Sequence, residues 1–170
     1  MTITLERAGP ERRGTLEALF QLYTHDFSET WAGTARGELG EDGRFPDYPY
    51  LDRYWTEPGR EPYLIRAGGH LAGFVLINGY GHSGQPVDFS VAEFFVARKH
   101  RRSGVGRRAA RAVMAGRPGL WELAVARRNL GAQVFWRGVA AELSAGRVDE
   151  LDVCDDRWDG YILRFRIAPA

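Results

Sequence analysis

The chain has 170 residues, of which 44% are hydrophobic and 26% are charged. This length and composition suffice to bury one sizeable core, so we expect a single domain over residues 1–170. The formal net charge is +1 at pH 7, and no overall field attracts nucleic acid or an acidic membrane surface. The first residues are charged and no run approaches the roughly 20 apolar residues of a membrane span, so we expect a soluble, cytoplasmic protein.

Cys154 is the only cysteine. A single thiol excludes an internal disulfide and a metal site of the CxxC type. No catalytic pattern surrounds Cys154, so the sequence indicates an ordinary thiol and no metal.

The hydrophobic pattern of the first half predicts a strand, a helix, a long loop and a hairpin. Residues 2–8 alternate like a short strand, and a helix begins at Pro10 because apolar residues then recur with helical spacing. Residues 31–62 are rich in Gly, Pro, Asp and aromatic residues without a sustained period, which is typical of a loop long enough to carry a function. Strands 63–66 and 71–78 follow as a hairpin joined by two glycines.

In the second half, strands alternate with two helices. A strand over 87–97 leads into a helix that begins after Gly104, where the apolar period changes from two to 3.6. A strand over 120–126 precedes a second helix capped by Asn129. Two last strands, 147–153 and 160–167, close the sheet. The order predicts an α/β fold with one mixed sheet and helices packed on it.

The segment "RRSGVG", residues 101–106, begins three residues after the strand of 87–97. A strand that runs into a glycine-rich turn and a helix makes a cradle for phosphate, because the first helical N–H groups have no internal partner and the helix dipole is positive there. The spacing is not that of a P-loop, which needs GxxxxGK followed by Ser or Thr. It is not the Rossmann GxGxxG either, because position 109 is Ala. We therefore expect a local anion site at this turn.

This turn resembles the signature of the GNAT superfamily of acyl-CoA-dependent N-acyltransferases, which is R/Q-x-x-G-x-G/A after a strand. Arg101, Gly104 and Gly106 match it. A second match lies downstream, where "NLGAQVFWRGVA" resembles the family helix NxxAxxFYxxxGF at Asn129, Ala132 and Phe135. The resemblance implies a single GNAT-like domain with a central mixed, mostly antiparallel twisted sheet of about six to seven strands flanked by helices.

The resemblance also implies an enzyme that transfers an acetyl group from acetyl-CoA to a primary amine by direct attack in a ternary complex. A small molecule is favoured over a protein as the acceptor. In the family the pantetheine arm pairs with the strand before the signature, the pyrophosphate sits on the turn, and the later helix lines the arm. The implied cofactor-binding residues are Phe94, Phe95, Val96, Arg101, Arg102, Ser103, Gly104, Val105, Gly106, Arg107, Asn129 and Phe135.

A base must remove a proton from the acceptor ammonium, since an alkylamine is protonated at neutral pH. Strict alternation along the strand of 87–97 places Glu93 on the face of Phe89, Val91 and Phe95, where burial raises the pKa of a carboxyl, unless a bulge changes the parity. Glu122, on the strand of 120–126, is the second candidate. The two remain alternatives at the level of sequence.

One departure from the family concerns the acid. Trp136 stands where the family usually has a tyrosine that protonates the departing sulfur, and Tyr161 is a candidate replacement. The tryptophan also motivates an alternative function, a GNAT fold that binds acyl-CoA as a sensor or binding module without turnover.

The acceptor site of the family is built by the first helix, the loop after it and the closing hairpin. This points to Tyr23, Asp26 and Trp31 as substrate-binding residues, and aromatics with carboxylates suit a small cationic or aromatic amine. The arginines around the signature lack interleaved aromatics, so no nucleic-acid partner is expected. A homodimer is possible if the last strand pairs with the edge of a partner's sheet.

Overall fold

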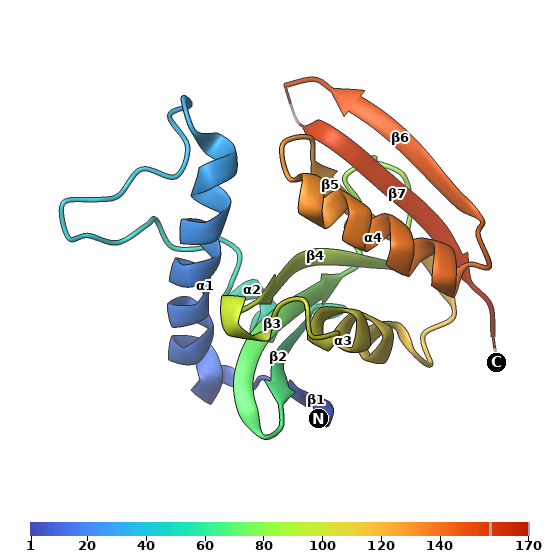
Figure 1. Cartoon of the computed structure of the whole chain (residues 1–170), viewed down its shortest axis with the longest axis horizontal. Helices are drawn as coiled ribbons and strands as arrows, with labels where there is room; N and C mark the ends of the chain where they lie inside the picture. The colour runs from blue at the N-terminus through green and yellow to red at the C-terminus, as the bar shows by residue number, and fades with distance from the viewer. Residues whose placement is uncertain (157, 170) are drawn as a thin grey trace.

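Seven strands form one sheet in the computed structural model, which describes residues 1–156 and 158–169 (Figure 1). The strand order is β1-β2-β3-β4-β5-β7-β6, and all neighbours are antiparallel except the parallel pair β4 and β5. The strands are β1 (Ile3–Arg7), β2 (Glu61–Ala67), β3 (His70–Asn78), β4 (Phe89–Val96), β5 (Gly119–Ala126), β6 (Val148–Cys154) and β7 (Asp159–Ile167). The mixed, mostly antiparallel sheet predicted from the sequence is confirmed.

Helices cover both faces of the sheet. They are α1 (Arg13–Ser28), α2 (Arg53–Thr56), α3 (Val105–Met114) and α4 (Leu130–Leu143), with 3-10 turns η1 (Pro10–Arg12), η2 (Glu29–Trp31) and η3 (Arg98–His100). The predicted helix from Pro10 therefore opens with a 3-10 turn. The loop predicted over 31–62 holds the single turn of α2, and Figure 1 shows it leaving the top of α1, running outward and returning to α2.

Alternate residues of β3 divide the core into two layers. Phe74 and Leu76 are fully buried against apolar residues of α1, whereas Val75 and Ile77 pack with residues of α3 and α4. Because side chains of a strand alternate between the two faces, α1 lies on one side of the sheet and α3 with α4 on the other. Figure 1 shows the same separation. For brevity, the side that carries α1 is called the α1 face.

One expectation about assembly is wrong. The last strand does not offer an edge to a partner chain, because β7 lies between β5 and β6 and is paired on both sides. The backbone N–H and C=O groups of β7 are therefore hydrogen-bonded to β5 and β6 and cannot pair with another chain. The two edge strands of the sheet are β1 and β6.

Candidate active site

The sheet opens between β4 and β5. The two strands pair only from Phe89 to Val91 on β4 and from Trp121 to Leu123 on β5, so the rest of β4 has no pairing with β5. On its other side β4 stays paired to β3 up to Val96. A parallel pair that parts midway leaves one row of backbone groups on each strand without a ladder partner.

The backbone groups that face this gap belong to Phe94 and Val96. Ala97 donates its N–H to the carbonyl of Ala72, at 2.8 Å, on the β3 side. Strand residues turn their N–H and C=O groups alternately to one neighbour and the other, so Val96 and Phe94 turn theirs away from β3. The Val96 carbonyl indeed accepts a hydrogen bond from Arg101 Nε at 2.6 Å. The amides of Phe94 and Val96 are thus available to a chain that lies in the gap.

The signature turn leads from β4 into α3. Gly104 has φ of 80° in the left-handed region, which favours glycine, and it precedes the first residue of the helix. Gly106 faces Phe135 of α4, since a Cβ added there would lie 3.4 Å from the Phe135 ring. The turn therefore presents the first N–H groups of α3, which have no partner within the helix. A side chain larger than that of glycine at position 106 would press against the Phe135 ring.

Asp26 joins the end of α1 to this turn. Its carboxylate accepts hydrogen bonds from Arg98 Nε, at 2.8 Å, and from Arg101 Nη2. Burial raises the pKa of Asp26, but the hydrogen bonds and charges of Arg101 and Arg98 outweigh it and hold the pKa below its ordinary value. Asp26, which the sequence analysis expected to bind substrate, is therefore already engaged by two guanidinium groups.

The remaining arginines of the turn differ in their partners. Arg107 and Arg111 both form ion pairs with Glu142 of α4, at 2.6 and 2.9 Å. Arg102, which has φ of 58°, has no ion pair or hydrogen bond from its side chain to any residue within 1–156 and 158–169. Ser103 Oγ donates to the carbonyl of His100, at 2.8 Å, and shapes the turn. Arg102 is thus the guanidinium of the turn best placed to meet an external anion.

An aromatic cluster stands behind the gap, on the side of α4. Phe94 stacks on Phe135 with ring centroids 5.8 Å apart, and Trp136 meets both rings edge-on. Asn129 caps α4, as predicted, because its side chain accepts the N–H of Ala132 at 3.1 Å. Tyr161 is held elsewhere, since its hydroxyl accepts a hydrogen bond from Arg127. These rings give the gap an apolar wall.

Glu93 lies on the α1 face, next to the gap. A bulge at Ala92 shifts the register, so that Val91 pairs with Ile77 while Glu93 pairs with Leu76. Glu93 consequently shares its face with Phe95 but not with Phe89 and Val91, and the expected parity is wrong on that point. A bulge inserts one residue on one strand, which moves all later side chains to the opposite face.

The Glu93 carboxyl is partly buried and its titration is strongly perturbed. Burial raises the pKa of Glu93 from 4.5 to about 7, although hydrogen bonds from Tyr23 and Tyr48 lower it. Tyr23 Oη, on α1, donates to Glu93 Oε2 at 2.7 Å. Tyr48, in the loop after α1, also lowers the Glu93 pKa, and the sequence did not single it out beyond its position in an aromatic segment. A carboxyl that titrates near neutral pH beside an open gap can exchange a proton with a bound amine.

Glu122 occupies a different environment from Glu93. It is fully buried, pairs with Arg164 of β7, and accepts the Ser83 hydroxyl and N–H at 2.6 and 2.9 Å. These contacts tie the loop between β3 and β4 to the sheet. Ser90 of β4, which lies opposite Glu122 in the β4–β5 pair, is also fully buried, and within the described chain its hydroxyl has no hydrogen-bond partner. The surroundings of Glu122 are those of a structural ion pair.

The aromatic residues expected to bind substrate lie along α1 and beyond it. Tyr23 contacts the rings of Phe74 and Phe95, and Trp31 packs on Phe27 with centroids 4.9 Å apart. Trp31 also lies against Gly37, where an added Cβ would come within 2.7 Å of its ring. Trp31 therefore holds the start of the loop on the end of α1.

No helix within 1–156 and 158–169 is long and apolar enough to cross a membrane. The same residues contain no cluster of three or more His, Cys, Asp or Glu side chains that could hold a metal ion.

Solved structures share this fold at low sequence identity. An acetyltransferase from Thermus thermophilus has a TM-score of 0.67 at 18% identity, with 98% of this chain and 97% of that chain covered. The PaiA N-acetyltransferase of Thermoplasma acidophilum, solved with coenzyme A, has a TM-score of 0.57 at 15% identity, with 98% and 99% covered. A chimera of the Vibrio cholerae spermidine N-acetyltransferase SpeG and hSSAT has a TM-score of 0.57 at 12% identity, with 99% and 96% covered.

Sequence comparison gives the family directly. No curated protein sequence matches the chain. The model of the acetyltransferase (GNAT) family matches residues 16–139, a span that contains Glu93, the signature turn and most of α4. That family uses acetyl-CoA as its acyl donor. The chain belongs to the acetyltransferase (GNAT) family and is an acyltransferase.

Proposed function

We propose that the protein transfers an acetyl group from acetyl-CoA to a primary amine, with Glu93 as the general base. The carrying observation is the Glu93 carboxyl itself, partly buried beside the gap with its pKa raised to about 7. An alkylammonium with a pKa of about 10.4 must lose a proton before its nitrogen can attack. A carboxylate that titrates near neutral pH combines the ionised form with a useful proton affinity.

In this proposal, acetyl-CoA is bound by backbone groups more than by side chains. The amides of Phe94 and Val96 are proposed to pair with the pantetheine arm, and the amides of the turn together with Arg102 to bind the phosphates. The thioester supplies an activated acyl group and a thiol leaving group. An N–H from β4 near the acyl oxygen stabilises the negative charge that forms there.

The chain supplies no tyrosine acid from α4. Trp136 contributes an indole ring to the apolar wall, and its neighbours Phe94 and Phe135 carry no hydroxyl. A thiol with a pKa of about 8.5 leaves tolerably as thiolate, so turnover does not depend on a proton from position 136.

A small primary amine is the proposed acceptor class. The base lies on the α1 face, where the Tyr23 hydroxyl donates to it, and aromatic rings suit the chain of an alkylamine or an arylalkylamine. One of the solved structures with this fold is a spermidine N-acetyltransferase chimera, so polyamines belong in the first acceptor panel.

The second candidate function is binding of acyl-CoA without turnover, and Trp136 in place of the family tyrosine favours it. Calorimetric titration with acetyl-CoA comes first, followed by an assay of free CoA thiol with spermidine, tyramine, lysine and a lysine-containing peptide as acceptors. Acceptor-dependent thiol release supports the enzyme, and release with the peptide alone makes a protein the acceptor. Binding without release from any acceptor would support the binding module, and a folded protein that does not bind acetyl-CoA would overturn both.

A further inference from the structure

The end of α1 is attached to β4 and to the turn after it at two positions of the helix. Tyr23 Oη donates to Glu93 Oε2 at 2.7 Å. The Asp26 carboxylate accepts hydrogen bonds from Arg98 Nε, at 2.8 Å, and from Arg101 Nη2. Residues three apart lie on the same side of a helix, so one turn of α1 contacts both the candidate base and the turn that precedes α3.

Arg101 leads back from Asp26 to β4 and closes a circuit of contacts. Its Nε donates to the Val96 carbonyl at 2.6 Å, and its guanidinium carbon lies 5.6 Å from the centre of the Phe95 ring. The Phe95 ring in turn meets the Tyr23 ring edge-on, with centroids 6.1 Å apart. The residues that close this circuit are called the α1 circuit below, and they are Glu93, Tyr23, Asp26, Arg101 and Val96.

Packing fixes the direction in which Tyr23 donates. Its ring contacts the rings of Phe20, Phe27 and Phe74, with centroids 5.9, 5.5 and 5.8 Å apart. Burial and the charge of Glu93 raise the pKa of the Tyr23 phenol, so at neutral pH the phenol keeps its proton and can donate a hydrogen bond to the carboxylate. A donor held by such packing limits the orientations that the Glu93 carboxylate adopts.

We propose that Tyr23 is a positioning residue for Glu93, and that the ion pairs of Asp26 keep this turn of α1 where the Tyr23 hydroxyl reaches the carboxylate. The helix then couples the turn before α3 to the orientation of the base. The role of Glu93 as base rests on the proposed function, whereas the α1 circuit and its effect on the Glu93 carboxylate do not.

The circuit has a consequence for the charge of Glu93. Burial favours the neutral carboxyl, whereas the Tyr23 donor favours the carboxylate. Tyr48, whose ring stacks on Phe20 with centroids 4.6 Å apart, and Tyr54 on α2 also interact with the charge of Glu93. Loss of the Tyr23 donor therefore shifts Glu93 toward the protonated form, which cannot take a proton from an ammonium group.

The test is a ¹³C NMR titration of the glutamate side-chain carboxyls, with the Glu93 signal assigned from its loss in Glu93→Gln. Tyr23→Phe removes the hydroxyl and keeps the ring packing. It is expected to raise the Glu93 pKa by about one unit, since a hydrogen bond to a charged group contributes roughly that much. A role of Tyr23 in packing alone would leave the Glu93 pKa unchanged, and that result would overturn the proposal.

Asp26→Ala tests whether the ion pairs act on Glu93 through Tyr23. Removing a negative charge and leaving two guanidinium groups uncompensated would by itself lower the pKa of another carboxyl, so the direct electrostatic effect and the proposed effect differ in sign. The proposal predicts an upward shift, smaller than that of Tyr23→Phe. It also predicts that Asp26→Ala adds no upward shift when it is combined with Tyr23→Phe. A Glu93 pKa that stays constant or falls in Asp26→Ala would overturn the coupling through α1.

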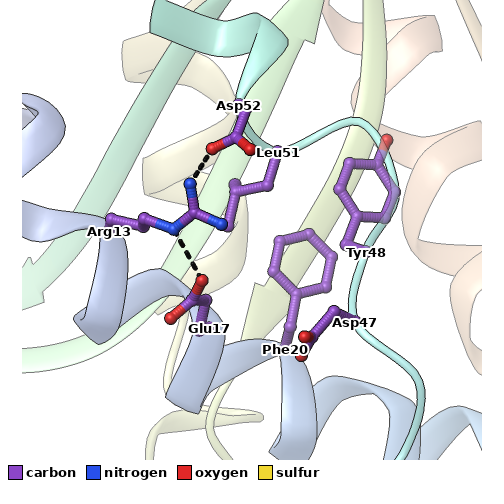
Figure 2. Close-up of a pocket in the computed structure, with 7 residues that line it drawn as sticks. All are labelled: Arg13, Glu17, Phe20, Asp47, Tyr48, Leu51 and Asp52. Atoms are coloured by element: carbon purple, nitrogen blue, oxygen red, sulfur yellow. Dashed lines mark hydrogen bonds and ion pairs between the residues drawn. The ribbon is translucent and has the colours of Figure 1, made fainter.

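Glu17→Ala is the matched control, because Glu17 forms its ion pair near the opposite end of the same helix. Figure 2 shows the Arg13 guanidinium between Glu17 and Asp52, outside the α1 circuit. The pocket that they line has a volume of about 30 Å³, room for little more than one water molecule. The Glu93 pKa in Glu17→Ala should equal that of the wild type. An upward shift as large as that in Asp26→Ala would mean that α1 loosens as a whole, and it would overturn the specific role of Asp26.

The proposed function is tested separately by the pH dependence of kcat/KM on the best acceptor. If Glu93 is the base, the acidic limb of that profile moves upward in Tyr23→Phe together with the NMR titration. If the NMR titration moves and the profile does not, Glu93 is not the base and the proposed function fails, while the positioning of the Glu93 carboxylate by Tyr23 stands.

Discussion

Asp26 and Arg101 join the C-terminal end of α1 to the turn before α3, across 75 positions of sequence. Arg101 at the same time donates to the Val96 carbonyl at the edge of the gap. One guanidinium thus links α1, the turn before α3 and the strand that borders the gap, so the geometry of the turn depends on α1.

Asp26→Asn is expected to destabilise the protein by about 1 kcal/mol at neutral pH, since it removes the charge from a partly buried pair of charge-assisted hydrogen bonds. The folded-state pKa of Asp26 is lowered, so its contribution is fully present above the unfolded pKa of about 3.8 and is lost as pH falls through the folded value. Urea unfolding at neutral pH and at acid pH measures this difference. Asp149→Asn, an exposed carboxylate on β6, is the matched control, and its loss at neutral pH should be smaller than that of Asp26→Asn. Equal losses for Asp26→Asn at both pH values would contradict the ion-pair account.

Glu93→Gln is expected to change stability in the opposite direction. The folded-state pKa of Glu93 is raised from 4.5 to about 7, so the wild type holds an extra proton in that window and its stability falls as pH rises through it. Glutamine carries no charge to desolvate. The variant should therefore gain on the wild type by roughly 1 to 3 kcal/mol between about pH 5 and pH 8, as measured by urea unfolding. A difference between the two proteins that stays constant over this range would show that Glu93 titrates normally.

Glu122→Ala is expected to lower the free energy of unfolding far more than the loss of one partner of an exposed ion pair does. It leaves Arg164 as an uncompensated charge whose side chain is only 12% exposed, and breaking such a pair typically costs about 3 to 5 kcal/mol. Glu150→Ala, which breaks a more exposed pair with Arg137, should cost no more than about 1 kcal/mol. Thermal unfolding of the two variants decides the point, and similar small losses would mean that Glu122 is free for a chemical role.

Gly106→Leu is expected to weaken acetyl-CoA binding at least tenfold while the protein stays folded. The new side chain cannot pass Phe135, since a Cβ already lies 3.4 Å from that ring, and it would enter the space beside the gap. Gly138→Leu on α4 is the matched control, because a Cβ there meets no atom within 4 Å. Calorimetric titration with acetyl-CoA compares the two. If Gly106→Leu binds acetyl-CoA as tightly as the wild type does, acetyl-CoA does not bind beside this turn.

The turn before α3 and the start of α4 could be predicted from the sequence because their signals are local. A helix begins directly after Gly104, and Asn129 caps the next one, as the order of residues predicted. These features depend on a few consecutive residues whose backbone conformations are set by glycine and by capping side chains.

The surroundings of the two candidate bases could not be predicted, because they depend on contacts between distant segments. The bulge at Ala92 follows from the pairing of β4 with β3, which alternation within β4 does not encode. The partner of Glu122 is Arg164, 42 positions away, and the donor to Glu93 is Tyr23, 70 positions away. The loop after α1 has no periodicity, and only its docking on α1 shows what its aromatic rings contact.

The most direct test of the account is the pH dependence of kcat/KM for acceptor-dependent CoA release, measured for the wild type and for Glu93→Gln. The account predicts an acidic limb with a midpoint near the raised Glu93 pKa of about 7. It predicts that Glu93→Gln loses this limb and is about 100-fold slower or more, within the usual range for loss of a general base. Identical profiles and similar rates for the two proteins would contradict the assignment of Glu93 as the base.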